Sequence, residues 1–565
     1  MAQSKTDVKK VTTEALLADL KAVAGDGNSI TRFVYLSKGK FKKAYETHYP
    51  SFDAFRKAAG LVAPKSKVAA NGKPFAGGKT RAAEIKAGLP EAGKIKRYIL
   101  TSAQNNTHVH DAFWANLQAF AKHHSAEIMI GTFSYNQNQF GELAVKQGTD
   151  KPVEEVLWFD PAVKPFIRDS RIELAPGLVW CGEMNIQPTE ENPLSGLESY
   201  AHGASAIFPH TKIEMRSIAV PQGTPVKFNY TTGAVTLMNY IQKKAGLKAE
   251  HHHRYAFLLA EVDSAGDWWV RQVAARKNGR CIQDLNVVVE DGKVVSTKAP
   301  VEAITWGDLH AACAERWVVE SSLNMLDTLH PRYQFIHDIM EGASINRHDR
   351  KHKAVHQKFH TWLRGMHRLD AEMAETKEWL EKYLRPWCKT VVPDSNHDGW
   401  WLKSWLTEFD YRVDPANAEL FLKLQAFMYA EIRGGKKPKD VNITERAFVT
   451  EAGLKPGAIQ FLLPDESFLV AKEIECGMHG HLGPNGSMGT PLNLSKLGKK
   501  ATTAHTHSAG IFHGLYVAGT SSQLRWDYTY GPSSWSWSHV LCYPNGQRAI
   551  VTMRKGKWHA AAKSV

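Results

Sequence analysis

No stretch of the sequence approaches the run of about 20 apolar residues that a membrane-spanning helix requires, so we predict no transmembrane segment. The first residues, MAQSKTDVKKVTTEALLADL, lack the apolar core and the small-residue cleavage site of a secretory signal. We therefore expect a cytoplasmic protein. Its six cysteines lie far apart without a C-x-x-C pair, which argues against a disulfide framework and against a thiolate zinc site.

The composition is that of a globular protein, with 43% hydrophobic and 23% charged residues. A chain of 565 residues is long enough for two to four domains. The net charge of +14 is concentrated at one end, because residues 1–100 hold 20 Lys and Arg against 8 Asp and Glu. A basic end favours attraction to a polyanion such as DNA, although basic ends that only keep a protein soluble are about as common.

The first 60 residues are expected to form a small helical module. A helix is predicted over residues 12–24, and a second one begins near Ser51 and stops at Gly60. The runs ITRFVYLSKGKFKKAY and SFDAFRKAAGL resemble the helical DNA-binding modules that accompany phage and homing endonucleases. The alternative is a basic module that packs on the next domain or binds protein. Residues 61–95 are rich in Ala, Gly, Lys and Pro and are interpreted as a linker.

Residues 96–300 are predicted to form an α/β domain of unknown role. KRYILTSAQ and AEIMIGTF have the pattern of strands, and AFWANLQAFAKHH between them has the pattern of a helix, which indicates a βαβ unit with a parallel sheet. The segment VVVEDGKVVS indicates a hairpin.

From residue 300 onward, five short segments at the ends of apolar runs offer oxygen and imidazole ligands. The segments carry Asp308 and His310; Asp338; Asn396, His397 and Asp398; His479 and His481; and His505 and His507. Residues two apart in an extended segment point to the same side, so each D-x-H or H-x-H pair can reach one ion. Ligands at the ends of parallel strands converge on one crevice, where open α/β sheets have their sites.

The order of these five segments resembles the ligand set of the calcineurin-like metallophosphoesterases. This resemblance implies that residues 301–565 form a four-layer αββα sandwich of two mixed sheets flanked by helices. The sequence departs from the family pattern at His337, Ser395 and Ala504, where the family usually has glycine. The bulky His337 makes Asp349 an alternative to Asp338. In the fourth segment His479 is favoured over His481, because it directly follows a predicted strand.

The chain also resembles a group of tailed-phage proteins in this superfamily that is associated with host DNA degradation and DNA transfer. The segments that carry this resemblance are IQPTEENPLSGLES, SNHDGWWLKSWLTEFDYRVDPANAE, HGHLGPNGSMGT and VAGTSSQLRWDYTYGPSSWSWSH. SbcD-type nucleases are more distant relatives by motif. The resemblance implies a hydrolase that cleaves DNA in the cytoplasm of an infected bacterium, with DNA, other phage proteins and further copies of the chain as partners.

The family resemblance also implies a role for each residue. Asp308, His310 and His507 would hold one metal ion, Asn396, His479 and His505 would hold a second, and Asp338 would bridge the two. His397, which is not counted as a ligand, would protonate the leaving oxygen or stabilise the transition state. Carboxylate, amide and imidazole ligands without thiolate suit manganese, with iron, zinc and magnesium as alternatives.

Two further segments are candidates for substrate contacts. In INRHDRKHKAVHQKFH, the side chains of Arg347, His348 and Arg350 would neutralise substrate phosphates, although a solvated helix face is an equally good interpretation. Trp535 and Trp537 of WSWSH have the chemistry to stack on bases, but Trp at alternating positions is more typical of a strand that packs on the core.

The sequence therefore predicts a two-metal-dependent DNase. The alternatives are a phosphatase or cyclic phosphodiesterase that acts on proteins or small phosphoesters, and a DNA-binding phage protein without catalytic activity.

Overall fold

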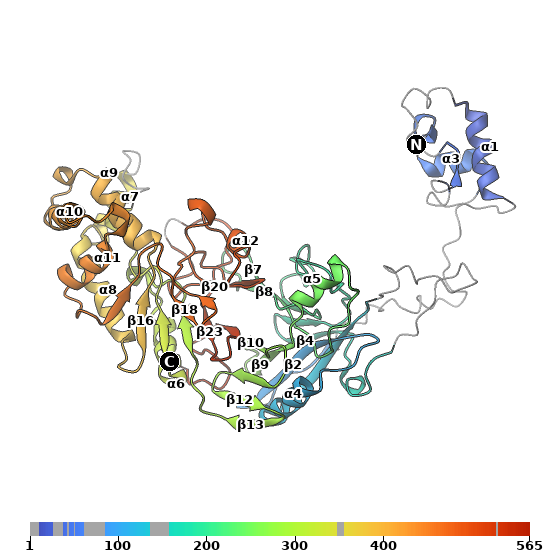
Figure 1. Cartoon of the computed structure of the whole chain (residues 1–565), viewed down its shortest axis with the longest axis horizontal. Helices are drawn as coiled ribbons and strands as arrows, with labels where there is room; N and C mark the ends of the chain where they lie inside the picture. Colours follow the sequence, from blue (N-terminus) through green and yellow to red (C-terminus); the bar gives the residue numbers. More distant parts are fainter. Residues whose placement is uncertain are drawn as a thin grey trace. The chain divides into compact units, whose positions relative to one another are not determined.

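The chain divides into two compact units, Met1–Thr80 and Arg81–Val565 (Figure 1). The structure is a computed structural model, and it describes residues 11–25, 35, 38–41, 44–49, 51–61, 85–135, 158–346, 355–526 and 529–564. Among these residues, no helix combines the length and the apolar character that crossing a membrane requires.

The first unit is built on the two helices that the sequence predicts. Helix α1 (Thr13–Ala24) is capped by Thr12, whose hydroxyl accepts a hydrogen bond from the amide of Ala15. Helix α3 (Phe52–Ala58) is capped by Ser51 in the same way, and the short 3-10 turn η2 (Ala44–Thr47) precedes it. Aromatic and leucine side chains from all three elements form the core, which contains Leu16, Leu20, Tyr35, Tyr45, Phe52 and Phe55.

A four-stranded sheet in the second unit contains the predicted βαβ element. Its order is β10-β9-β2-β3, with β2 and β3 parallel and α4 connecting them. The elements are β2 (Ile95–Gln104), α4 (Asp111–His124), β3 (Glu127–Phe133), β9 (Ala256–Asp263) and β10 (Trp268–Ala274). A three-stranded sheet follows, with strands β11 (Cys281–Asp284), β12 (Val287–Glu290) and β13 (Lys293–Ser296). Strands β12 and β13 form the predicted hairpin.

The six-stranded sheet is mixed, and its order is β17-β16-β15-β14-β23-β24. Strands β14 to β17 are parallel, as expected for a region in which helices alternate with strands. The strands are β14 (Ala303–Thr305), β15 (Tyr333–Phe335), β16 (Lys389–Val392), β17 (Ile459–Phe461), β23 (Ser538–Cys542) and β24 (Arg548–Thr552). The last two strands form the antiparallel hairpin that the turn at Asn545 and Gly546 predicts.

Helices cover this sheet through the largest hydrophobic core, and α8, α9, α10 and α11 gather beside β16 in Figure 1. The core takes Val318, Leu326, Leu380, Trp405 and Leu424 from the amphipathic faces of these helices. The helices of this core are α6 (Arg316–Leu329), α8 (Leu369–Tyr383), α9 (Trp401–Glu408), α10 (Ala418–Arg433) and α11 (Ile443–Glu445), whereas α7 (Val355–Leu363) contributes no buried residue to it.

An eleven-stranded sheet contains strands from the chain before and after residue 300, because β7 pairs with β21. Its order is β1 (Ile85–Lys86), β4 (Arg171–Ala175), β5 (Leu178–Cys181), β6 (Ser205–Phe208), β8 (Lys227–Thr231), β7 (Met215–Ile218), β21 (Gly510–Phe512), β22 (Leu515–Val517), β20 (Lys500–Thr503), β19 (Ile474–Glu475) and β18 (Leu469–Val470). Helices α5 (Lys244–His252) and α12 (Pro491–Leu494) lie outside the sheets. Strand β1 falls within the range that the sequence suggests as a linker, and it pairs with β4.

The chain is therefore a mixed α/β protein, and the region after residue 300 contributes strands to two large sheets. None of the six cysteines, all of which are among the described residues, forms a disulfide, and four of them are buried.

Candidate metal centre

The parallel strands of the six-stranded sheet deliver the first ligand-type residues. Asp308 and His310 follow β14, Asp338 follows β15, and Asn396 follows β16, so all four lie at the carboxyl ends of neighbouring parallel strands. The loop after β14 is held in place by the segment after β22, since the amide of Asp308 donates to the carbonyl of Gly519 at 3.2 Å. Gly307 makes this approach possible, because a Cβ at its position would lie 2.6 Å from the backbone nitrogen of Thr520.

The eleven-stranded sheet delivers the remaining residues in the same way. His479 follows β19, and His505 and His507 follow β20, which is parallel to β19. The amide of Ala504 donates to the carbonyl of His479 at 2.8 Å, so the two loops are tied to each other. Residues from two sheets and five separate loops therefore meet at one place.

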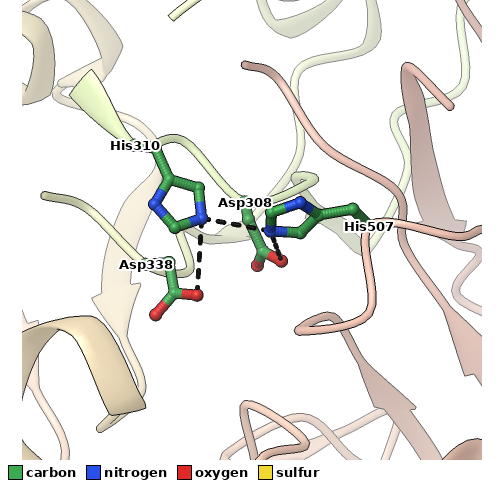
Figure 2. A group of neighbouring side chains, drawn as sticks. All are labelled: Asp308, His310, Asp338 and His507. Atoms are coloured by element: carbon green, nitrogen blue, oxygen red, sulfur yellow. Dashed lines mark hydrogen bonds and ion pairs between the residues drawn. The ribbon is translucent and has the colours of Figure 1, made fainter. Parts of the chain in front are cut away.

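The first group of side chains consists of Asp308, His310, Asp338 and His507 (Figure 2). The Nε2 atoms of His310 and His507 lie 3.1 Å apart. His507 Nε2 is 3.1 Å from Asp308 Oδ2, and His310 Nε2 is 3.5 Å from Asp338 Oδ2. Two imidazole nitrogens and two carboxylates thus face a common point.

The second group consists of Asp338, His479 and His505, with Asn396 beside them. His479 Nε2 lies 3.2 Å from Asp338 Oδ2 and 3.1 Å from Asn396 Oδ1. Because Asp338 belongs to both groups, the two groups are adjacent and share one carboxylate.

The chemistry of these donors fits a divalent cation. All four side chains of the first group are buried, and neither carboxylate oxygen of Asp308 accepts a conventional hydrogen bond. A buried carboxylate without hydrogen bonds costs free energy unless a cation compensates it. Burial lowers the pKa of both His505 and His507 to about 4, so at neutral pH these imidazoles are uncharged, as metal ligands must be.

The two carboxyl groups differ in their electrostatics. Burial, and then the charge of Asp338, raises the pKa of Asp308 well above its usual value. Burial acts in the same direction on Asp338, but the neighbouring His479 and His397 outweigh it and lower the pKa of Asp338. Like charges this close together cannot both be ionised without cost, which is the arrangement that a bound cation relieves.

Four residues of the site have strained backbone conformations. The φ angles of His310, Asp338, His505 and His507 are 42°, 41°, 75° and 56°, in the left-handed region that residues other than glycine rarely adopt. Such conformations cost free energy and persist where the surrounding structure holds them, most often at functional sites.

His397 lies beside the first group, and with His310 and Glu341 it forms a third set of side chains close enough to hold a metal ion. Its Nδ1 lies 2.8 Å from the carbonyl oxygen of Glu341, its ring lies 4.0 Å from that of Trp401, and its backbone amide donates to Asp338 Oδ1 at 3.4 Å. Burial lowers the pKa of His397, but the charges of Asp338 and Glu341 outweigh burial and raise it. If Nδ1 donates to the carbonyl, Nε2 is the atom free to exchange a proton.

Asp398 connects two loops of the site through hydrogen bonds and is not a member of the two ligand groups. Its carboxylate accepts hydrogen bonds from the backbone amides of Ile339 and Met340, at 3.1 and 3.2 Å, and from the hydroxyl of Ser395. The residue sits in the π-helical turn η9 (Asn396–Trp400), a rare conformation that is enriched at functional sites. Asp398 thereby ties the loop that carries Asp338 to the loop that carries Asn396.

The structure distinguishes between the alternatives that the sequence left open. His479, and not His481, lies within 3.2 Å of Asp338 and Asn396. The bulky His337 is accommodated behind His479, with 3.3 Å between their Nδ1 atoms, and Asp338 takes part in both groups. Asp349 and the candidate phosphate-binding residues Arg347, His348 and Arg350 lie outside the described residues.

The two tryptophans of WSWSH have different surroundings. The Trp537 ring packs on Trp317 and its Nε1 donates to the carbonyl of Ser522, in keeping with a core position. The Trp535 ring instead contacts His507, with 4.3 Å between centroids, and also Trp526.

Two residues of this site are absent from the sequence-based expectations. Glu341 lies with its Oε2 3.0 Å from His310 Nδ1, and Trp526 places its ring centroid 4.7 Å from that of His310. The signal for Glu341 was a second carboxylate within the apolar segment IHDIMEGAS, three residues after Asp338. For Trp526 no local pattern separates it from the many other tryptophans of the chain.

The fold and the site together define a mixed α/β protein with a buried cluster of histidines and aspartates that has the composition of a metal centre. No protein-family model matches the chain, and no solved structure matches it. Protein A1 of Escherichia phage T5 is 35% identical over 488 residues, which cover 83% of this chain and 84% of that protein. The chain belongs to the family of bacteriophage proteins that includes Protein A1.

Proposed function

We propose that the chain is a DNase of the calcineurin-like metallophosphoesterase class, which uses two divalent cations to hydrolyse phosphodiester bonds and degrades host DNA during infection. The observation that carries the proposal is the pair of ligand groups that share Asp338. The phage origin of the relative and the +12 charge of residues 1–100 support DNA as the substrate.

Each side chain has a defined task in this proposal. Divalent cations, most favourably manganese, would supply a Lewis acid that polarises the phosphodiester and lowers the pKa of water. The residues that would hold them are Asp308, His310, His507, Asp338, Asn396, His479 and His505. His397 would hold a proton on Nε2 and give it to the leaving oxygen, while the carbonyl of Glu341 keeps its ring in place.

The test is cleavage of linear and closed circular duplex DNA by the purified chain with manganese, measured on gels beside metal analysis of the same sample. We expect the wild type to cut and Asp308→Asn to lose activity. Asp327→Asn is the matched control, because this exposed carboxylate pairs with Arg385 at 2.6 Å on the surface. A wild type that leaves both DNAs intact with manganese, magnesium, zinc and iron would contradict the proposal.

Hydrolysis of the small substrate bis(p-nitrophenyl) phosphate separates the DNase from an enzyme that acts on small phosphoesters. Removal of residues 1–80 takes away the first compact unit and none of the second. For a DNase we expect this truncation to weaken DNA binding and flatten its salt dependence, while turnover of the small substrate is retained. A chain that binds DNA but holds no metal would instead be a non-catalytic DNA-binding protein.

A further inference from the structure

A cavity of about 340 Å³ opens beside the ligand groups. It is bounded by the loop after Asp338, by α7 and by the segment after β22, through the side chains of Glu341, Asn346, Gln357, Arg364, Gln523 and Trp526. This volume is at the lower end of the roughly 300–1,000 Å³ that ligand pockets have. Two of these residues meet the ligand groups, because Glu341 forms a candidate cation-holding set with His310 and His397, and Trp526 contacts His310 and His507.

Two of the lining residues connect the cavity to the candidate catalytic residues. Glu341 lies at the buried end, where its Oε2 is 3.0 Å from His310 Nδ1 and 3.8 Å from His397 Nδ1. Trp526 forms a wall that is common to both places, since its ring centroid lies 4.7 Å from His310 and 5.3 Å from His507. A molecule in the cavity would therefore lie beside the ligand groups, on the other side of Trp526.

The ring of Trp526 is held firmly enough to act as a stacking surface. Its contacts with His310, His507 and Trp535 are all edge-to-face, with interplanar angles of 73°, 67° and 70°. Edge-to-face packing fixes the plane of a ring. Stacking of a base on such a ring is favourable for every base, because each base has an aromatic face.

The remaining side chains offer the other contacts that a nucleotide needs. Asn346, Gln357 and Gln523 carry amide groups that both donate and accept hydrogen bonds, as the edges of bases require. Arg364 adds a guanidinium group, whose planar fork suits a phosphate.

We propose that this cavity binds one unpaired nucleotide of the DNA strand beside the phosphodiester that is cleaved, with its base on Trp526 and a phosphate at Arg364. The inference rests on the proposed function, and it identifies the substrate as single-stranded or locally unpaired DNA. Within a duplex, the faces of a base are covered by its stacked neighbours, so a paired nucleotide cannot use the cavity without leaving the helix.

The test measures binding rather than cleavage. Every sample carries Asp308→Asn in the full chain with manganese present, so that the DNA stays intact. The probes are an oligothymidylate that contains one 2-aminopurine, a duplex of the same sequence closed by hairpins at both ends, and the free monophosphate of 2-aminopurine deoxyribonucleoside. Quenching of the 2-aminopurine fluorescence reports stacking, and titration gives the Kd.

We expect Trp526→Ala to abolish the quenching and to weaken binding of the single strand about tenfold, which is the usual contribution of one stacked base. Binding of the closed duplex should be unchanged. Trp387→Ala is the matched control, since this exposed tryptophan stacks on His330 at the surface. Arg364→Gln should weaken single-strand binding and reduce the slope of log K against log salt by about 0.7, as expected for one phosphate contact.

Three results would overturn the inference: equal single-strand affinities for Trp526→Ala and Trp387→Ala, an equal loss for the closed duplex, or quenching of the free monophosphate as strong as that of the strand. If Trp526→Ala fails to fold by circular dichroism, the exposed Gln523→Ala takes its place, with a severalfold loss expected for the single strand alone. A wild type that cuts no DNA but shows the Trp526-dependent quenching would contradict only the proposed function.

Discussion

The two ligand groups share Asp338 but differ in charge. The first group has two carboxylates and two imidazoles, whereas the second has one carboxylate, two imidazoles and the amide of Asn396. Because cation affinity rises with the number of charged ligands, the first group is expected to bind a divalent cation more tightly. Two adjacent sites built from the same residue types therefore differ in their expected affinity for a cation.

The groups also differ in the side chain that contacts the Nδ1 atom of a ligand-type histidine. His310 has the carboxylate of Glu341 at 3.0 Å from its Nδ1, which favours a proton on Nδ1 and leaves Nε2 as the ligand atom. His479 has His337 in the corresponding place, at 3.3 Å. Burial lowers the pKa of His337 to about 4, so this neighbour is neutral and supports His479 without adding negative charge.

Removal of the shared carboxylate should have the largest effect, because it damages both groups at once. We expect Asp338→Ala to bind less than one cation per chain and to lose DNA cleavage by about a thousandfold or more, since metal ions supply several kcal/mol to such reactions. Metal analysis and cleavage rates measure this. Full retention of one cation would show that the groups are independent.

Substitution of His397 should separate cation binding from catalysis in both groups. We expect His397→Ala to keep its cations and to cut DNA about a hundred- to ten-thousandfold more slowly, the usual contribution of a positioned acid. The control is His330→Ala, at an exposed position. Loss of the cations in His397→Ala would instead assign His397 to the ligand set.

Neutralisation of Glu341 should affect the two groups unequally. We expect Glu341→Gln to lower the affinity of the first group for manganese by about 10- to 100-fold, the usual effect of removing a partner of a ligating histidine, while the second group changes little. Calorimetric titration with manganese resolves the two affinities. Equal losses at both groups would contradict the asymmetry.

The smallest effect concerns stability alone. Burial raises the pKa of Glu372 from 4.5 to about 7, and one of its oxygens accepts the amide of Gly342 at 2.5 Å. The folded chain therefore holds this proton more tightly than the unfolded chain, and stability falls as pH rises from about 4.5 to about 7. The loss amounts to roughly 3 kcal/mol.

We expect Glu372→Gln to remove this component of the pH dependence and to be more stable than the wild type above pH 7, as measured by thermal unfolding. Glu378→Gln, on the exposed side of the same helix, is the control. Identical pH profiles for the wild type and Glu372→Gln would refute the assignment to Glu372. Cation binding by both groups should be unaffected.

Local sequence patterns were sufficient to predict those elements that depend only on residues close together in the sequence. The caps Thr12 and Ser51, the βαβ unit after residue 95 and the turn at Gly546 are determined by residues that are close in sequence, and all are present in the structure. The continuity of the eleven-stranded sheet across residue 300 could not be predicted in this way, because pairing of β7 with β21 joins segments almost 300 residues apart.

The residue types at the ends of the strands, and their order, could be predicted from the sequence, because alternating strands and helices bring the carboxyl ends of parallel strands to one edge. The preference for His479 over His481 also came from the sequence, whereas the support of His310 by Glu341 and the position of Trp526 between the ligand groups and a cavity are evident only in the tertiary structure. These choices depend on packing between loops of two different sheets, and no spacing within one segment records which side chain a distant loop will meet.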